Sequence, residues 1–456
     1  MRWTFAVAAL ALTAGHALAQ STSAHATLSG DVAATDNALS APTNAEADLF
    51  FQLRPGLLFT YDSPRAMQEL TIDGEILEYV RHSDAPSVTE KAAWRAVFLP
   101  GPLSEIAMSV AAGTGQLNAI TTSTSPDQAP VGLVPSGAIS ERDVNADEYG
   151  SHTLSPGWRI TESLAAHYTG TNDTQSTRTH SGAAGANAGV EYSWRENAVS
   201  VEGGVEYLHL ERYAPQLPPG PDGSRLTREL NPHAVLSWRH DFTRYWSGSA
   251  SAGLKYLGPI GTDKYNPGDV QQKGFFPLLG AQVSYTDIWG RATLSANRSL
   301  APNLFIAQNT ETTSALAQLA LPLPWLDDSR RRAPRLVALG TVGVEHTRLI
   351  QTDLNNAVAA TFDVAHLDVA LAYTPQPGFT YGLRYEFLYQ TGSQSPLALV
   401  SAYRRNTLFF TFAIRYPDRV AVTIPKRQNS ARADRKDLPP IGEEVVVPDN
   451  PNDGDR

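Results

Sequence analysis

Charged residues in this sequence recur at every second position between apolar ones. Glu191 alternates with Val190 and Tyr192, and Arg239 alternates with Leu236 and Trp238. Period-two alternation places such residues on one face of a β-strand, where charges of both signs can form cross-strand ion-pair ladders or contact a hydrated solute. Both roles stay open for this polar face. Its expected members are Glu191, Arg195, Glu202, Glu206, Arg239, Asp241, Lys255, Arg291, Asp368, Arg384 and Glu386.

Catalytic chemistry is not expected from the sequence. His180 precedes Ser181, but neighbours in a strand point to opposite faces and cannot act as base and nucleophile. No G-x-S-x-G, P-loop or H-E-x-x-H motif is present, and the chain has no cysteine, which excludes disulfides and thiolate metal sites. We therefore expect neither an enzyme nor a cofactor.

The elements that must position the polar face are amphipathic strands. In residues 367–389, Leu367, Val369 and Leu371 share one face, and Tyr381 and Leu383 continue it after a Pro-Gly turn. The apolar face is rich in aromatics, whereas the opposite face is polar. A soluble sandwich turns its apolar face inward and seldom ends strands with aromatics. Membrane barrels turn it to lipid and carry aromatic girdles, so the pattern favours a transmembrane hairpin.

The N-terminal segment is consistent with export. Residues 1–19 combine Arg2, an apolar run from Phe5 to Leu12 and small residues at Ala17 and Ala19, which predicts a secretory signal peptide cleaved before Gln20. No later run is long and apolar enough for a spanning helix. An exported chain of this kind enters a membrane as a closed barrel, so the expected location is the outer membrane, in contact with its lipid. The net charge of −10 argues against nucleic acid as a partner.

Turn residues divide the chain into about eighteen strands, with sixteen as the alternative count. This all-β, antiparallel transmembrane barrel would have short periplasmic turns and long extracellular loops, with both termini in the periplasm. The barrel is expected over 20–417, followed by a disordered periplasmic tail at 418–456 that is rich in charge and proline. The expected strands are 25–37, 48–61, 68–80, 91–99, 103–112, 148–155, 158–168, 182–195, 198–213, 229–241, 244–257, 275–286, 290–300, 310–323, 335–348, 358–373, 379–390 and 405–416.

Four local features carry further expectations. Pro55 and Gly56 predict a bulge or bend within a strand. The stretch 116–144 is predicted to be a large loop because it is too polar for a spanning strand, and a loop there could fold into the lumen. Glu162 falls on the lipid-facing side unless a bulge moves it. Residues 325–334 predict a long periplasmic turn with three consecutive arginines.

Several turn motifs resemble those of a known group of proteins. TDNALSAP (Thr35–Pro42), LRPGLLFTYDSPR (Leu53–Arg65), GQLNAI (Gly115–Ile120) and LSPGWR (Leu154–Arg159) look like those of large bacterial outer-membrane barrels associated with exopolysaccharide secretion. The resemblance covers the first third of the chain by motif. It implies about eighteen strands and a periplasmic polysaccharide export protein as partner, and it carries over no polymer-binding residue.

The leading functional hypothesis is therefore an outer-membrane conduit for an exported polysaccharide. A polymer could exchange hydrogen bonds with the polar lining, and the lining fits a porin-like diffusion or uptake channel for small solutes equally well. A third hypothesis is a structural or surface-display barrel plugged by its long loops.

Overall fold

Eighteen antiparallel strands make up the part of the chain that the structure, a computed structural model, describes. That part is residues 21–38, 44–82, 87–117, 139–172, 178–213, 225–260, 273–287, 289–303, 308–323, 335–350, 361–376, 378–392 and 402–416. The strands are β1 (Ser21–Thr35), β2 (Asp48–Ser63), β3 (Ala66–Tyr79), β4 (Ser87–Gly101), β5 (Ser104–Leu117), β6 (Ile139–Ser155), β7 (Trp158–Asn172), β8 (Arg178–Trp194), β9 (Asn197–Tyr213), β10 (Arg225–Asp241), β11 (Trp246–Leu257), β12 (Gly274–Asp287), β13 (Gly290–Asn303), β14 (Gln308–Pro322), β15 (Leu336–Leu349), β16 (Thr361–Gln376), β17 (Phe379–Gln390) and β18 (Tyr403–Tyr416).

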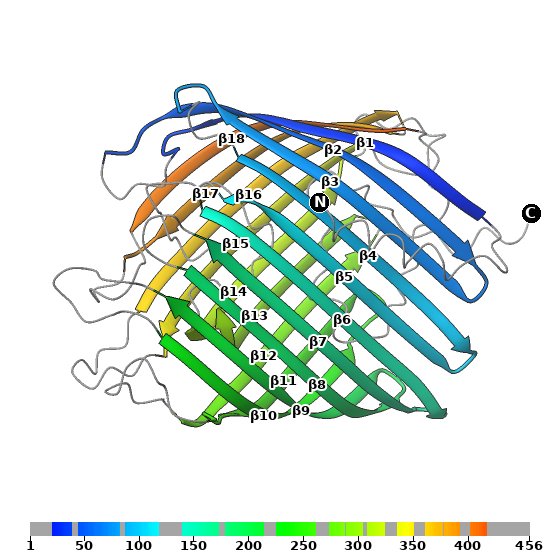
Figure 1. Cartoon of the computed structure of the whole chain (residues 1–456). Helices are drawn as coiled ribbons and strands as arrows, with labels where there is room; N and C mark the ends of the chain where they lie inside the picture. Colours follow the sequence, from blue (N-terminus) through cyan, green and yellow to red (C-terminus); the bar gives the residue numbers. More distant parts are fainter. Residues whose placement is uncertain are drawn as a thin grey trace, which may run out of the picture.

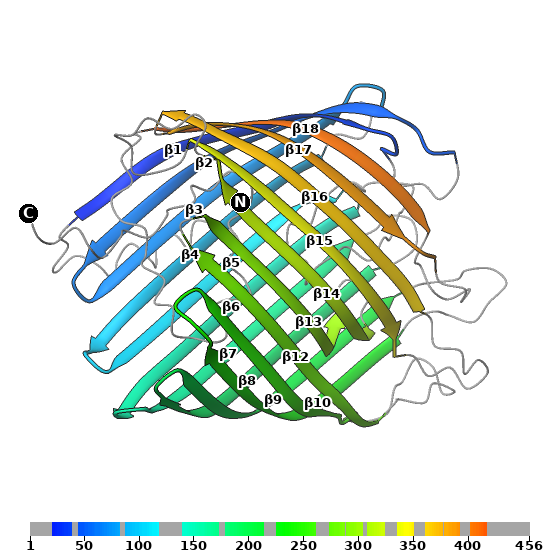
Figure 2. The same ribbon diagram turned by 180° about the vertical axis from the view of Figure 1, so that it is seen from behind.

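Each strand pairs with its neighbours in sequence, and β1 closes the sheet on β18 (Figure 1). The closing ladder runs from Ala26 opposite Tyr416 to Thr35 opposite Thr407. Tight turns such as Ser63–Ala66 and Trp194–Asn197 alternate with longer connections. Because the strand count is even, the start of β1 and the end of β18 lie at the tight-turn end. The expected topology is confirmed, and Figures 1 and 2 show the closed wall from opposite sides.

The two faces of the wall differ in exposure. A curved sheet spreads side chains on its convex face, so the face with exposed large apolar groups is the outer one. Val201 is 58% exposed and Leu294 60% exposed, whereas their polar neighbours Glu202 and Ser295 are less exposed. Outward apolar and inward polar residues are the pattern of a barrel in lipid.

Aromatic side chains border the outer apolar surface at both ends. At the tight-turn end, the ring of Trp158 lies 4.7 Å from that of Tyr192, and Trp246 lies 4.9 Å from Tyr285. Trp158 and Tyr168 lie ten residues apart on β7, which for a strand tilted by about 45° corresponds to a height of about 24 Å along the barrel axis. This height matches the apolar band of outer-membrane barrels, so the chain is an outer-membrane β-barrel. In the described residues no helix is long and apolar enough to cross a membrane.

The structure tests several local expectations. At Pro55 and Gly56 the β2–β3 ladder is interrupted but resumes in the same register, so no residue is inserted and the expected bulge is absent. Strand β6 begins at Ile139, nine residues before the expected start, because its charges alternate toward the interior while residues such as Val144 face outward. Glu162 keeps the unshifted register opposite Gly150 and stays on the outer face.

Other expectations fall outside the described residues. These are the signal peptide, the arginine-rich turn at 325–334, the tail at 418–456 and most of the 116–144 stretch. They stay predictions.

The inner face carries a packed apolar cluster where the two ends of the chain meet. Phe50, Tyr79 and Phe409 are almost fully buried, with ring centroids 5.6 Å apart for Phe50–Tyr79 and 5.9 Å apart for Phe50–Phe409. Ala38, from the connection after β1, packs on the same cluster. The described start of the connection, at Ala38, therefore packs against the inner wall between β2, β3 and β18.

Candidate functional site: a constriction in the barrel

Three of the predicted polar residues meet on neighbouring strands. Arg384 of β17 contacts the carboxylate of Asp368 on β16 at 2.5 Å and that of Glu386 at 3.0 Å. Arg405 of β18 contacts the other oxygen of Glu386, also at 3.0 Å. All four side chains are at least four-fifths buried, and the Arg384 guanidinium lies 5.1 Å from the ring centre of Phe409. This is an ion-pair network across β16–β18, with each acid bonded to an arginine.

Three further predicted residues also form inner-face ion pairs. Lys255 of β11 donates from Nζ to Glu206 of β9 at 2.6 Å, across the intervening strand β10. Glu191 of β8 pairs with Arg159 on β7 and accepts a hydrogen bond from Ser193 at 3.2 Å. Residues separated by one strand can meet this way only on the same face of the sheet, as the alternation predicts.

The remaining predicted residues divide into two groups. Glu202, Arg239 and Arg291 lie half-buried on the inner face. Arg195 and Asp241 instead lie at the tight-turn end of the barrel. Arg195 occupies the β8–β9 turn with a φ of 49°, because a two-residue hairpin requires positive φ there, and its side chain is exposed rather than inside the wall.

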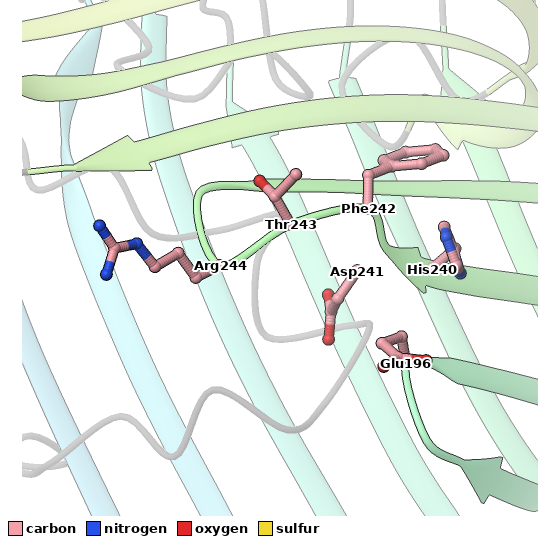
Figure 3. Close-up of a pocket in the computed structure, with 6 residues that line it drawn as sticks. All are labelled: Glu196, His240, Asp241, Phe242, Thr243 and Arg244. Atoms are coloured by element: carbon pink, nitrogen blue, oxygen red, sulfur yellow. The ribbon is translucent and has the colours of Figure 1, made fainter.

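Asp241 ends β10 and lines a pocket of about 510 Å³ at this rim (Figure 3). Its backbone N–H donates to the Glu196 carbonyl at 2.9 Å, and Arg244 extends away from the other lining side chains. The pocket is formed by two adjacent turns. Arg195 and Asp241 therefore lie at the rim where the strands end, and both side chains are exposed.

A residue set that the sequence analysis missed narrows the interior. The β12–β13 ladder stops at Leu279 opposite Arg298. Strand β12 nevertheless extends back to Gly274, where it pairs only with β11, and β13 extends on to Asn303, where it pairs only with β14. The β13–β14 hairpin therefore separates from β12 at its long-loop end.

The separated hairpin crosses the barrel interior. Asn309 of β14 donates from Nδ2 to Glu229 Oε2 of β10 at 2.7 Å. Four inter-strand spacings of about 4.8 Å would keep these strands roughly 19 Å apart along the wall. Two side chains of this length cannot span that distance, so the hairpin must run inward to reach β10. Asn231 donates to the same Glu229 oxygen at 3.0 Å, and all three residues are buried.

Two other sets of contacts hold the hairpin. Lys255 donates to the Leu300 carbonyl of β13 at 3.1 Å while it also contacts Glu206. Leu300 packs with Leu257 and Ile350 in a buried apolar cluster, against which Phe276 and Leu278 of β12 are partly buried. The constriction thus has a polar side at β9–β11 and an apolar side toward β12.

A second missed group spans β1–β3. Arg54 contacts Asp31 at 3.2 Å and Glu75 at 2.9 Å. The signal was present in the sequence, because Arg54 alternates with the outward residues Phe51 and Leu53. Extending the alternation of Leu236 backward along β10 would likewise have placed Glu229 and Asn231 inside.

The inner face of β6 carries three acids, Glu141, Asp143 and Asp147, at alternate positions, and Asn145 fills the position between the last two. Lys91 of β4 interacts electrostatically with both Glu141 and Asp143. The opposing positions on β5 are Gly115, Gly113 and Ser109, whose side chains are small. Asp147 is 3.4 Å from His167 Nε2. This strand gives the interior a local negative charge.

At the long-loop rim, a histidine links two connections. His82 contacts Asp48 through Nδ1 at 2.8 Å and Glu46 through Nε2 at 2.9 Å. The hydrogen bond to Asp48, with a smaller effect of Glu46, raises the pKa of His82 above its ordinary value. The protonated ring can donate to both carboxylates, so this link is strongest when His82 is charged.

Comparisons with known proteins identify no family for the chain. No family model matches it, and no curated protein is similar to it by sequence. Solved barrels are similar at low identity. OccK2 (OpdF) of Pseudomonas aeruginosa, solved with glucuronate, is 11% identical with a TM-score of 0.45, covering 88% of this chain and 100% of that one.

Two other solved barrels show the same level of similarity. OccAB3 of Acinetobacter baumannii is 10% identical with a TM-score of 0.42, over 87% of this chain and 99% of that one. The alcaligin receptor FauA of Bordetella pertussis is 10% identical with a TM-score of 0.41, over 86% and 76%. At this level these matches contribute nothing to the functional argument, which depends on the geometry above.

Proposed function

We propose that the chain is a diffusion channel of the outer membrane for small hydrophilic solutes. The observation that carries this proposal is the contact between Asn309 and Glu229, which draws the β13–β14 hairpin across the interior of an eighteen-stranded barrel. Barrels of this strand number enclose an aqueous channel when nothing fills them. A hairpin across that channel reduces its width, which suits small solutes better than a polymer.

The charge of the wall favours cations among these solutes. Most inner-face acids on the other strands described above are paired with a base, as in the networks of Glu386 and Glu206. On β6, Glu141, Asp143 and Asp147 share one side of the strand, where Glu141 and Asp143 both interact with Lys91 of β4 and Asp147 lies 3.4 Å from His167 Nε2. Where carboxylates outnumber a nearby base, as Glu141 and Asp143 outnumber Lys91, the wall raises the local concentration of cations, so cations should pass more readily than anions.

Export of a polysaccharide, the leading hypothesis from the sequence, depends on the resemblance of the turn motifs and on the tail at 418–456. The same holds for a periplasmic export protein as partner. No contact among the described residues favours polysaccharide export or an export-protein partner. We therefore do not propose them, and the test below can detect a polysaccharide.

The test is transport by the purified, folded full chain in liposomes. Swelling rates with a graded series of neutral sugars should fall steeply from monosaccharide to trisaccharide, and a KCl gradient across a planar bilayer should give a cation-selective reversal potential. Equal permeation of large and small sugars would reject the constriction. A folded barrel with no conductance would indicate a plugged structural barrel. A conductance that a long polysaccharide blocks would favour the export hypothesis instead.

A further inference from the structure

We propose that Pro277 and Pro302 are positioning residues that keep the β13–β14 hairpin inside the barrel and thereby set the size limit of the channel. This inference depends on the proposed function only for its consequence on solute size. Its structural part, which concerns the position of the hairpin, stands on the strand pairing.

The seam at which the hairpin leaves the wall contains both prolines. The ladder between β12 and β13 ends with Leu279 opposite Arg298. If the same register continued, Pro277 would lie opposite Leu300, and Pro302 would lie opposite Phe275. The two prolines therefore occupy the second and the fourth of the pairs that the ladder fails to form.

Each proline remains in the ladder on its other side. Pro277 is paired with Leu254 of β11, and Pro302 is paired with Asn309 of β14. In an antiparallel ladder a residue directs its N–H and C=O to one neighbouring strand only. A proline is tolerated where its missing N–H points away from the strand with which it pairs. Each proline therefore turns the side of its backbone that lacks an N–H donor toward the gap between β12 and β13.

Strand β2 shows what a single proline does in this barrel. Pro55 keeps its pairing with Leu28 of β1, while the ladder to β3 is interrupted beside it. The ladder resumes at Gly56 opposite Asp73 in an unchanged register. One missing donor is therefore a local defect. Two missing donors on facing strands, close to the strand ends, leave no paired segment beyond them from which the ladder could recover.

The freed hairpin then has better partners inside the barrel. Leu300 joins the buried cluster with Leu257 and Ile350, and its carbonyl accepts from Lys255. Asn309 reaches Glu229. The inward position thus gives the Leu300 carbonyl a hydrogen-bond donor and buries the Leu300 side chain, which the unpaired edge of the wall would not do.

The experiment restores the donors and follows the hairpin by cross-linking cysteine pairs with a short bis-methanethiosulfonate reagent. The double variant Pro277→Val/Pro302→Thr is compared with the native chain and with Pro55→Val, a matched proline replacement in a remote strand. The chain contains no native cysteine, so two reporter pairs can be introduced without background. Phe276→Cys/Ala301→Cys reports a closed seam, and Glu229→Cys/Asn309→Cys reports the inward hairpin.

In the native background and in Pro55→Val we expect the Glu229/Asn309 pair to cross-link and the Phe276/Ala301 pair to fail. In the double proline variant this preference should reverse. Swelling assays should then show a loss of size exclusion, with a trisaccharide entering, and a unit conductance that is roughly doubled if the open cross-section doubles.

An unchanged cross-linking preference in a folded double variant would overturn the proposal, and so would a closed seam with an unchanged size limit. Heat-dependent migration on gels verifies that each variant is folded. If the double variant does not fold, the single variant Pro302→Thr replaces it in the same cross-linking and swelling assays. A native chain that conducts nothing would reject the proposed function, but the cross-linking result would still decide whether the prolines position the hairpin.

Discussion

Replacing Glu386 by glutamine should destabilise the barrel strongly, because it removes the shared acceptor of two buried arginines. Glu386 bonds Arg384 and Arg405 at 3.0 Å each, and the side chain of Arg405 is only 4% exposed. Breaking a buried ion pair from one side costs about 3–5 kcal/mol, since the remaining charge stays desolvated. Arg384 keeps Asp368, so we expect the lower end, about 3 kcal/mol.

The assay is urea unfolding of Glu386→Gln in liposomes, followed by tryptophan fluorescence and gel migration. Asp363→Asn is the matched control, because Asp363 pairs with His346 at 2.7 Å but both side chains are more than half exposed. Exposed pairs contribute less than about 1 kcal/mol. The double variant with Arg405→Met should lose much less than the sum of the two single changes. If Glu386→Gln lowers the free energy of unfolding no more than Asp363→Asn does, then water in the barrel screens the ion pairs of Glu386, and the large effect expected from burial is refuted.

Three further predictions follow from single sites. The ion pair between His82 and Asp48 stabilises the long-loop rim fully below the ordinary histidine pKa of about 6.5, and this stabilisation is lost as pH rises through the raised pKa of His82 in the folded state. Proteolysis of this rim should therefore increase with pH in the native chain but not in His82→Ala. Asp143→Asn should lower the cation preference of the reversal potential while leaving the sugar size limit unchanged. Gly157→Ala should lower the free energy of unfolding by about 1–3 kcal/mol, because φ is +85° and an added Cβ would lie 2.6 Å from the Ser193 carbonyl oxygen. Gly101→Ala is the control and should leave the free energy of unfolding nearly unchanged, because the space around Gly101 is open.

The barrel could be predicted from the sequence because each strand is governed by a local rule. Outward Leu236 and Trp238 alternate with inward Ser237 and Arg239, and the two-residue periodicity needs no knowledge of distant partners. The same rule placed Asp368, Arg384 and Glu386 on one face, and the structure confirms that they are in contact.

The constriction could not be predicted in this way, since it depends on strands that are distant in sequence. Alternation places Glu229 inside, but nothing near it specifies that Asn309 will arrive from β14. The two prolines were visible, yet their effect depends on which edge each presents, and this is known only once the register is fixed. Alternation also does not show where a strand stops, so it could not tell that Arg195 and Asp241 lie at the rim.

The most direct test of the constriction is whether a short bis-methanethiosulfonate reagent cross-links Glu229→Cys to Asn309→Cys in the otherwise cysteine-free chain, in intact outer membranes. Ser237→Cys/Ser251→Cys, which joins paired positions on β10 and β11, is the positive control for wall contacts. We predict that the Glu229/Asn309 pair cross-links, as this control does, and that reduction of the cross-link leaves the barrel folded. A control pair that cross-links while the Glu229/Asn309 pair does not would contradict a hairpin that crosses the interior, and with it the small-solute channel.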